Sequence, residues 1–414
     1  MERRSAGLPA TAAGVAGWSA LPGDLLDQIS GYLSTDADHL HVRQVCAHWR
    51  AYTHPLTAPR PWIIALGSPP APAGDAPHHS AWLPRRLHHH QRKKVEMGAP
   101  PAGLPYCRGA SRGWLALADD ARSPNRLVLW DPASGAEVPL PCLSSVAQIF
   151  LSGDPLGSAD WMAVASQRLG KWATKSFFWR PGDTAWSSLY EHPTAGVVSV
   201  AFHGGRVFYM DWRRVIAAYD LNLGAPHRPP AKAGVSYFGC QVNRLCRCER
   251  LIHHAREALV VSCNGELLLV VLRSGTPSRR GGRPLPPPWR VSPACSSFAE
   301  VYRLDWMPEG RPEVGERVMD LGEHSLFLGL SESFALSAKE CPAIRRNHIY
   351  CLARNWHYSR DRQHKLSDWA FIFDLGSDTL KGIPYPEELR DEEPNWWACS
   401  WLCLRSPLLK KQQQ

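Results

Sequence analysis

Three cysteines and two histidines gather in the segment CQVNRLCRCERLIHH, and their side chains are of the types that bind zinc. They are Cys240, Cys246, Cys248, His253 and His254, and zinc in proteins takes thiolate and imidazole ligands. The spacing of the thiols is not a usual knuckle spacing, and on a strand Cys246 and Cys248 would point to one face as small apolar side chains. We therefore expect no metal here. The histidines at 88–90 lie in a basic run and are expected to be solvated.

Catalytic motifs are also missing from the sequence. There is no G-x-S-x-G, no Walker loop and no dinucleotide fingerprint. The segment SGDPLGSADW (152–161) comes nearest to the S-x-D-x-G-x-x-W box of sialidase-type propellers, but Leu156 stands where the glycine should be. Turn chemistry explains that segment. The sequence predicts no catalytic residue, no metal and no cofactor.

Composition narrows the class of protein. The chain has 414 residues, with 36 Pro, 32 Gly and 18 Trp, a mixture that favours many short strands joined by turns over a helical bundle. Much of its net charge of +9 lies in two loop-like runs, 84–94 and 273–290, and in the LLKK tail. No nucleic-acid-binding motif accompanies the charge. We expect solvated insertions there, and no nucleic-acid partner.

The cellular compartment is inferred from the cysteine pattern and from the lack of a long apolar run and of a signal peptide in the sequence. The 12 cysteines are scattered singly, no run of about 18 apolar residues occurs, and the first residues do not resemble a signal peptide. We expect a protein of the cytoplasm, the nucleus or both, with reduced thiols and no membrane contact.

The segment LPGDLLDQISGYL (21–33) predicts a helix. Pro22 suits a first helical turn, and Leu25, Leu26, Ile29 and Leu33 share one face. A second pattern, Val42, Val45, Cys46 and Trp49, follows i, i+3, i+4, i+7 and predicts a helix that ends before Pro55. Two such helices are too small to bury a core of their own. They either cap the remainder of the chain or keep an apolar face for a partner.

From about residue 60 onward, short apolar runs alternate with turn residues. Lead-in strands such as RGWLALA and GGRVFYM recur at intervals of 47 residues, from Gly113 to Asp160, and 45 residues, from Asp160 to Gly205. Strands that end in Asp, such as LVLWDPASG and VIAAYDLNLG, recur at roughly twice that distance. A period of about 40–50 residues is typical of β-propeller blades. SLFLGLSESFALSA is expected to be a hairpin within a blade, and WWACSWLCL (396–404) the strand that closes the ring.

An aspartate follows several of these strands. A carboxylate at this position can accept backbone N–H bonds in the next turn without any ligand. The sequence therefore predicts turn formers, and no general acids, at Asp131, Asp220, Asp305 and Asp374.

Residues 18–53, WSALPGDLLDQISGYLSTDADHLHVRQVCAHWRAYT, resemble an F-box, with His39 where the family more often has an apolar residue. The resemblance implies docking on the Skp-type adaptor of a cullin–RING ubiquitin ligase. The adaptor-binding residues that it implies are Leu21, Pro22, Leu25, Leu26, Ile29, Val42, Val45, Cys46 and Trp49. Burial in the module's own core is the alternative for each of them, and for Leu33.

Residues 110–400 resemble the kelch-like C-terminal domain of plant F-box proteins. The features that carry the likeness are SRGWLAL with LWDPASG, VAFHGGRVFYMD, the SLFLG…SFALSA block, and NHIYCL with FIFDLGSDTL. The resemblance implies that this domain recruits a protein substrate, which the sequence does not identify.

These observations predict a mainly β protein with a small α module. We expect a disordered N-terminus (1–17), an F-box (18–55) and a kelch-like β-propeller of five to seven blades (60–405) with a flexible insertion at 273–290. The expected function is that of a non-catalytic, substrate-recognition subunit of an SCF-type ligase. Alternatives are an adaptor-binding scaffold that does not promote degradation, and a propeller enzyme with a helical cap.

Overall fold

The computed structural model describes residues 18–33, 36–53, 61–68, 81–86, 100–169, 174–192, 197–211, 213–225, 228–237, 256–273, 299–329, 332–341, 344–352, 368–384 and 395–403. The chain divides into two compact units, Met1–Thr57 and Ala58–Gln414. Several sequence predictions lie outside the described residues: the N-terminus 1–17, the cysteine- and histidine-containing segment 240–254, the histidines 88–90 and nearly all of the insertion 273–290.

The first unit is helical. It contains a short 3-10 helix, η1 (Trp18–Ala20), followed by α1 (Gly23–Gly31), α2 (Asp36–Gln44) and α3 (Ala47–Tyr52). Helix α1 occupies the segment for which the sequence predicts a helix, and begins directly after Pro22. None of the helices in the described residues is long and apolar enough to cross a membrane.

The second predicted helix is divided into two, which corrects the prediction. The backbone of Cys46 is extended (φ −165°, ψ 173°), and its sulfur accepts the N–H of Trp49 at 3.4 Å. Cys46 therefore serves as the N-cap of α3, a role in which a side-chain acceptor satisfies an orphan N–H of the first turn. The shared face of Val42, Val45, Cys46 and Trp49 is interrupted at this break.

Polar contacts tie the ends of the first unit together. The indole N–H of Trp49 donates to Trp18 O at 2.9 Å, and His48 Nε2 lies 2.8 Å from Leu21 O. A guanidinium nitrogen of Arg43 donates to Thr53 O at 2.9 Å. These bonds join the start of the unit to α3, and α2 to the residue after α3.

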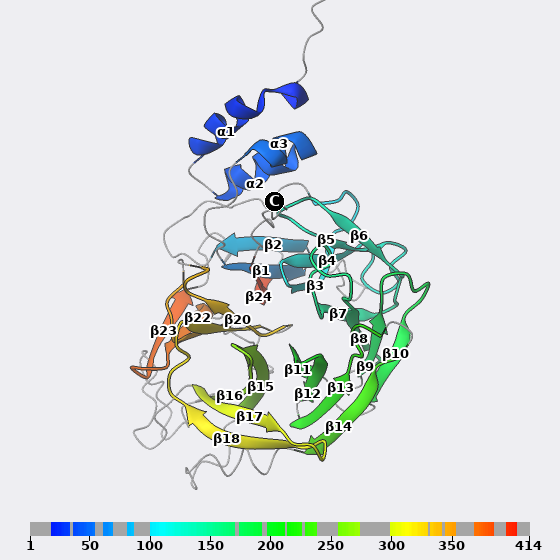
Figure 1. The fold of residues 1–414 in the computed structure, drawn as a ribbon, viewed down its shortest axis with the longest axis vertical. Helices are drawn as coiled ribbons and strands as arrows, with labels where there is room; N and C mark the ends of the chain where they lie inside the picture. Colours follow the sequence, from blue (N-terminus) through cyan, green and yellow to red (C-terminus); the bar gives the residue numbers. More distant parts are fainter. Residues whose placement is uncertain are drawn as a thin grey trace, which may run out of the picture. The chain divides into compact units, whose positions relative to one another are not determined.

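The strands of the second unit form six sheets among the described residues, arranged as a ring in Figure 1. Four of these sheets have four antiparallel strands in chain order. The first contains β3 (Tyr106–Ser111), β4 (Trp114–Ala118), β5 (Leu127–Trp130) and β6 (Glu137–Leu140). The second contains β7 (Val146–Leu151), β8 (Ala163–Arg168), β9 (Thr174–Trp179) and β10 (Ser187–His192). The third contains β11 (Val197–His203), β12 (Arg206–Asp211), β13 (Val215–Asp220) and β14 (Ala231–Tyr237), and the fourth β15 (Arg256–Cys263), β16 (Glu266–Arg273), β17 (Ala299–Trp306) and β18 (Pro312–Val318).

Two sheets depart from this arrangement. One has five strands in the order β20–β19–β21–β22–β23, namely β19 (His324–Leu328), β20 (Phe334–Ser337), β21 (His348–Leu352), β22 (Asp368–Asp374) and β23 (Thr379–Pro384). The other has three strands, β2 (Ala81–Arg86), β1 (Pro61–Ser68) and β24 (Asn395–Cys403). The described residues thus form a mainly β propeller with five blades of four or five strands and a sixth, three-stranded sheet, within the predicted range of blade numbers.

The predicted hairpin and the predicted closing strand are both confirmed. Strand β19 pairs antiparallel with β20, and on its other side it pairs parallel with β21. Strand β24, near the C-terminus, pairs antiparallel with β1, from Pro61 opposite Cys403 to Ser68 opposite Asn395. The ring is therefore closed by pairing two strands from distant parts of the chain, which removes an exposed sheet edge.

Three of the four predicted turn-forming aspartates are confirmed. Asp131 Oδ1 accepts Ala133 N at 3.0 Å, Asp220 Oδ1 accepts Asn222 N at 3.0 Å, and Asp374 Oδ1 accepts Gly376 N at 2.9 Å. The prediction is wrong for Asp305, which lies inside β17 opposite Glu313 of β18. The strand continues one residue further there, so this carboxylate has no turn to cap. In SGDPLGSADW, Asp154 Oδ1 accepts Leu156 N at 3.2 Å, which is turn chemistry as predicted.

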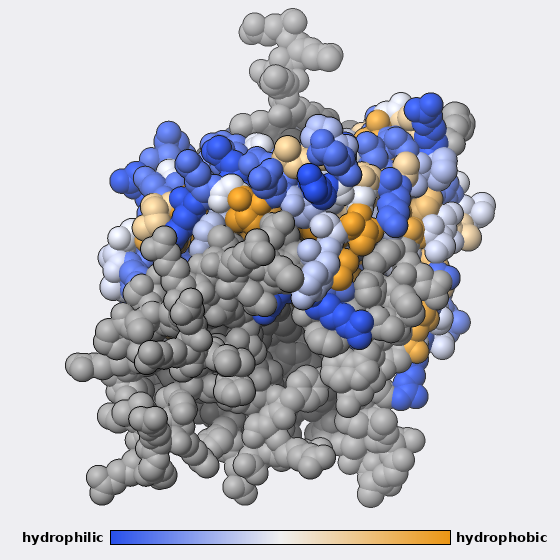
Figure 2. Space-filling view, turned by 90° about the horizontal axis from the view of Figure 1, so that it is seen from below, coloured by the Kyte–Doolittle hydropathy of each residue, from blue (hydrophilic) through white to orange (hydrophobic). Residues whose placement is uncertain are grey.

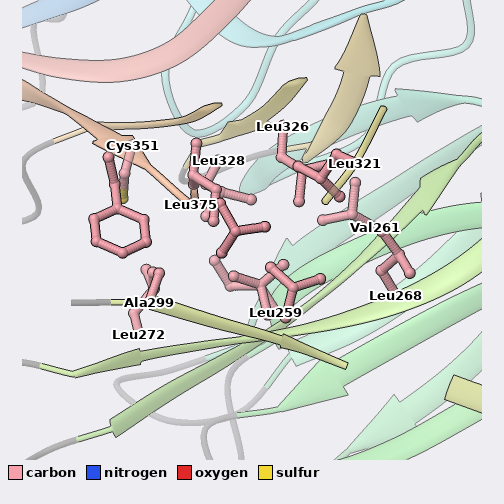
Figure 3. Packing of buried hydrophobic residues seen from close by; sticks show 14 of the residues in the cluster. Leu259, Val261, Leu268, Leu272, Ala299, Leu321, Leu326, Leu328, Cys351 and Leu375 are labelled. Atoms are coloured by element: carbon pink, nitrogen blue, oxygen red, sulfur yellow. The ribbon is translucent and has the colours of Figure 1, made fainter. Parts of the chain in front are cut away.

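Apolar side chains fill the spaces between neighbouring sheets. Between the β15–β18 and β19–β23 sheets, Leu259, Val261 and Leu268 pack with Leu326, Leu328 and Leu375 (Figure 3). On the face shown in Figure 2, hydrophilic residues cover most of the coloured surface and hydrophobic ones form separate small patches. The apolar side chains packed between the sheets stabilise the fold by roughly 25 cal/mol per Å² of apolar surface that they bury.

Candidate binding sites

Helix α1 leaves an apolar stripe exposed. Leu25 and Ile29 are 44% and 41% exposed, whereas Leu26 is fully buried. Positions i and i+4 of a helix share a face, so Leu25 and Ile29 lie side by side. Tyr32, which directly follows the helix, is 80% exposed. Exposed neighbouring apolar side chains of this kind are a feature of protein-binding surfaces.

The structure separates the predicted adaptor-binding residues into groups. Pro22, Leu25, Ile29 and Val45 are exposed, while Leu21, Val42, Cys46 and Trp49 are half-buried, as is Leu33. Leu26 is a correction to the predicted docking face, because a fully buried side chain presents no surface to a partner. Cys46 and Trp49 have internal roles, since one caps α3 and the other bonds to Trp18.

In the second unit, a cluster forms where the innermost strands of several sheets meet. We call it the axial cluster, and it consists of Ser111, Arg112, Leu151, Phe202 and Glu332. Ser111 ends β3, Leu151 ends β7, and Phe202 lies one residue before the end of β11. Glu332 lies between β19 and β20 in the chain and forms an isolated parallel bridge with Val200 of β11.

Glu332 is the buried carboxyl of the axial cluster, at 6% exposure. Ser111 Oγ donates to Glu332 Oε2 at 2.5 Å and accepts the N–H of Leu151 at 2.9 Å. Burial raises the pKa of Glu332, while the charge of Arg112 and the bond from Ser111 act in the opposite direction. The net shift is upward, so the site favours the neutral acid. Beside it, the buried hydroxyl of Ser333 has no hydrogen-bond partner among the described residues.

Arg112 lies at the exposed side of the axial cluster. Its Nε donates to Leu151 O at 2.8 Å, and its guanidinium carbon lies 5.9 Å from the centroid of the Phe202 ring, within cation–π range. Its backbone is left-handed, with φ of +50°. The arginine thus reaches from the first four-stranded sheet to the second and the third.

His203 is the last residue of β11 and directly follows Phe202 in the chain. Its Nδ1 lies 3.0 Å from Ser262 Oγ of β15, and burial lowers the pKa of the imidazole. The ring is therefore held mainly neutral at pH 7. Among the described residues, no three metal-ligating side chains come close enough to hold an ion.

Sequence reasoning missed the axial cluster. Ser111 and Arg112 occur in the recognised SRGW repeat and Glu332 in the SLFLGLSES block, but nothing in the spacing indicates that these segments meet. One signal was present in the sequence, namely an arginine before glycine at a hairpin turn where the equivalent turns have Gly-Gly and Asn-Gly.

The closed ring of sheets defines a β-propeller protein, a fold compatible with protein binding. The sequence model of the KIB1-4 beta-propeller family matches residues 83–374, and the chain belongs to that family. None of the curated protein sequences compared with the chain matches it.

The solved structures that the comparison matches have low sequence identity and low TM-scores. TolB from Acinetobacter baumannii has 10% identity and a TM-score of 0.38, with 82% of this chain and 66% of that chain covered. A putative 6-phosphogluconolactonase from Bacteroides uniformis has 10% identity and a TM-score of 0.35, with coverages of 78% and 81%. The Cps50 (Swd1) β-propeller domain from Myceliophteria thermophila has 8% identity and a TM-score of 0.35, with coverages of 73% and 80%.

Proposed function

We propose that this chain is a non-catalytic substrate receptor of an SCF-type cullin–RING ubiquitin ligase. The helical unit docks on the Skp-type adaptor, and the propeller holds a protein target. The protein acts in the cytoplasm, the nucleus or both. The F-box-like sequence of residues 18–53 supports the adaptor assignment, and the family of the second unit supports a propeller that binds a partner.

The exposed stripe of Leu25 and Ile29 is the observation that carries the proposal. Leu26 is buried inside the helical unit, whereas Leu25 and Ile29 are exposed to solvent. Exposed apolar side chains of this kind are typical of a surface that another protein covers. The predicted contact is therefore redefined: Leu25, Ile29 and Val45 are the anchors, and Leu26 supports the helix from inside.

The test is a pull-down of the Skp-type adaptor with Ile29→Asp in the full chain. A charge at a buried apolar anchor should weaken capture by about 2 kcal/mol or more, which is at least about thirtyfold. Gln28→Asp is the matched control, because Gln28 is exposed on the same helix and gains the same charge. Capture of the adaptor by Ile29→Asp at the wild-type level would overturn the assignment.

A receptor differs from a scaffold in what happens to the captured target. Affinity purification after proteasome inhibition should recover the adaptor together with a ubiquitinated protein. Ile29→Asp should retain that protein without its ubiquitin chains. Recovery of an unmodified target with wild type and variant alike would instead favour the scaffold.

A further inference from the structure

Three hairpin turns at one end of the ring have the same backbone geometry. Each connects the first and second strands of a sheet through two residues with positive φ. These residues are Arg112-Gly113 (+50°, +84°), Gly204-Gly205 (+55°, +74°) and Asn264-Gly265 (+49°, +78°). Two successive left-handed residues define a type I′ turn, which strongly prefers Asn or Gly at its first position.

Arg112 is the member of this set that departs from the preference. A left-handed conformation costs an ordinary L-residue about 1–2 kcal/mol, which glycine avoids and asparagine reduces. Glycine or asparagine, the residues at this position in the two equivalent turns, would adopt the turn conformation at a lower energetic cost. A residue that is locally unfavourable at a matched position indicates that its side chain has a use elsewhere.

The contacts of Arg112 hold the side chain in place and leave part of it unused. Nε is bonded to Leu151 O, and the guanidinium lies over Phe202. The two terminal nitrogens make no hydrogen bond to the described residues, and the side chain is exposed to solvent. A guanidinium fixed by its Nε and by an aromatic ring presents a planar pair of donors, the geometry that binds carboxylate and phosphate with two parallel bonds.

Arg112 has an acidic neighbour in the axial cluster. It is Glu332, and burial raises the pKa of that carboxyl while the charge of Arg112 acts in the opposite direction. Asp154, in the connection between β7 and β8, accepts Leu156 N and the indole N–H of Trp114 of β4 through the same oxygen, Oδ1. His203 is held mainly neutral by burial. Arg112 itself is exposed, so its guanidinium presents a positive group to solvent at this end of the ring.

We propose that Arg112 is the anchor of a binding site for an anionic side chain, carboxylate or phosphate, on a peptide segment of the target protein. Phe202 and Leu151 hold the guanidinium in position, and Glu332 lies beneath it. The inference rests on the proposed function insofar as the propeller holds a target. The site lies on the propeller and needs no residue of the helical unit.

The test measures binding of fluorescein-labelled peptides to the full-length protein by fluorescence polarisation at two salt concentrations. The probes are hexaglutamate, a peptide of the same length with one phosphoserine, and hexaglutamine as the uncharged reference. Arg112→Asn, which suits the turn, should weaken binding of the better anionic probe at least about tenfold, since an arginine–carboxylate or arginine–phosphate pair is charge-assisted and bidentate. Its thermal midpoint should be equal to or above that of the wild type.

The matched control is Arg311→Asn, which removes one exposed positive charge from the turn between β17 and β18. It should leave binding of the anionic probe within about twofold of the wild type. A general effect of net charge would instead weaken binding by the same factor in both variants. Equal losses for the two variants, or no loss for Arg112→Asn, would overturn the proposal. Capture of the Skp-type adaptor by Arg112→Asn should remain at the wild-type level, so that failure of the anionic site and failure of the ligase assignment are separate results.

Discussion

Ser111 and Glu332 lie 221 positions apart in the chain and are joined by a hydrogen bond of 2.5 Å from Ser111 Oγ to Glu332 Oε2. The same hydroxyl accepts the N–H of Leu151, so one serine connects three sheets of the ring. Glu332 adds a fourth through its backbone bridge to Val200. A buried polar network with these connections fixes how the sheets are placed around the axis, provided that its members are satisfied.

The first prediction concerns the pH dependence of propeller stability. Burial raises the pKa of Glu332 in the folded state. The unfolded chain releases this proton first as pH rises past about 4.3, so stability falls with rising pH until the folded carboxyl also ionises. Glu332→Gln removes this loss. The variant should melt at a higher temperature than wild type at pH 7, and the difference should disappear toward pH 4.

Glu309→Gln is the control for that experiment, because Glu309 is exposed on the turn between β17 and β18. It should leave the melting temperature nearly unchanged across the same pH range. A lower melting temperature of Glu332→Gln at pH 7 would show that the charged form, paired with Arg112, stabilises the ring.

The second prediction concerns closure of the ring by β24. Trp401 is buried, donates its indole N–H to Leu328 O at 3.0 Å and lies edge-on to Phe327. Trp401→Phe keeps an aromatic ring but leaves the carbonyl of Leu328 without this donor, at a cost of about 1–3 kcal/mol. The free energy of unfolding, measured by denaturant titration, should fall by that amount.

Trp306→Phe is the matched control for this variant. Trp306 is half-buried at the end of β17, where it packs edge-on against Phe208. Its replacement should cost clearly less than that of Trp401. Equal losses at both positions would mean that the bond to Leu328 contributes nothing beyond aromatic packing.

The sequence predicted those features that depend on local pattern. Strands, turns and the approximate period follow from alternation of apolar and turn residues, and even the closing strand follows from the need to pair a free edge. Contacts such as that of Ser111 with Glu332 could not be predicted, because they depend on the path of a long chain around the ring. Periodicity likewise places Leu25 and Leu26 on one helix face and cannot tell which of them the unit buries. The helix break at Cys46 depends on a single capping contact.

The third prediction tests packing inside the helical unit. A Cβ placed on Gly23 would lie 2.3 Å from Cδ1 of Tyr52, closer than side chains approach one another. Gly23→Ala should therefore destabilise the unit despite the better helix propensity of alanine, which is about 1 kcal/mol in a helix interior. Helical circular dichroism of the full chain on heating reports this change.

Tyr52→Ala provides the partner for a double-mutant cycle. With the ring removed, Gly23→Ala should become neutral or stabilising, because the propensity gain is no longer opposed. Additive losses in the two variants would mean that the close approach of Gly23 to Tyr52 does not limit the packing of the unit.

The fourth prediction concerns thiol reactivity in the propeller. Burial raises the pKa of Cys107 to about 11 and that of Cys351 to about 12, whereas Cys142 is exposed. The thiolate is the reactive form, so at pH 8 a buried thiol with a raised pKa has very little of it. Iodoacetamide followed by peptide mass mapping should modify Cys142 in the native protein and Cys107 and Cys351 only after denaturation. Modification of all three at similar rates in native buffer would mean that the sheets carrying Cys107 and Cys351 open readily, which is incompatible with a ring closed by β24.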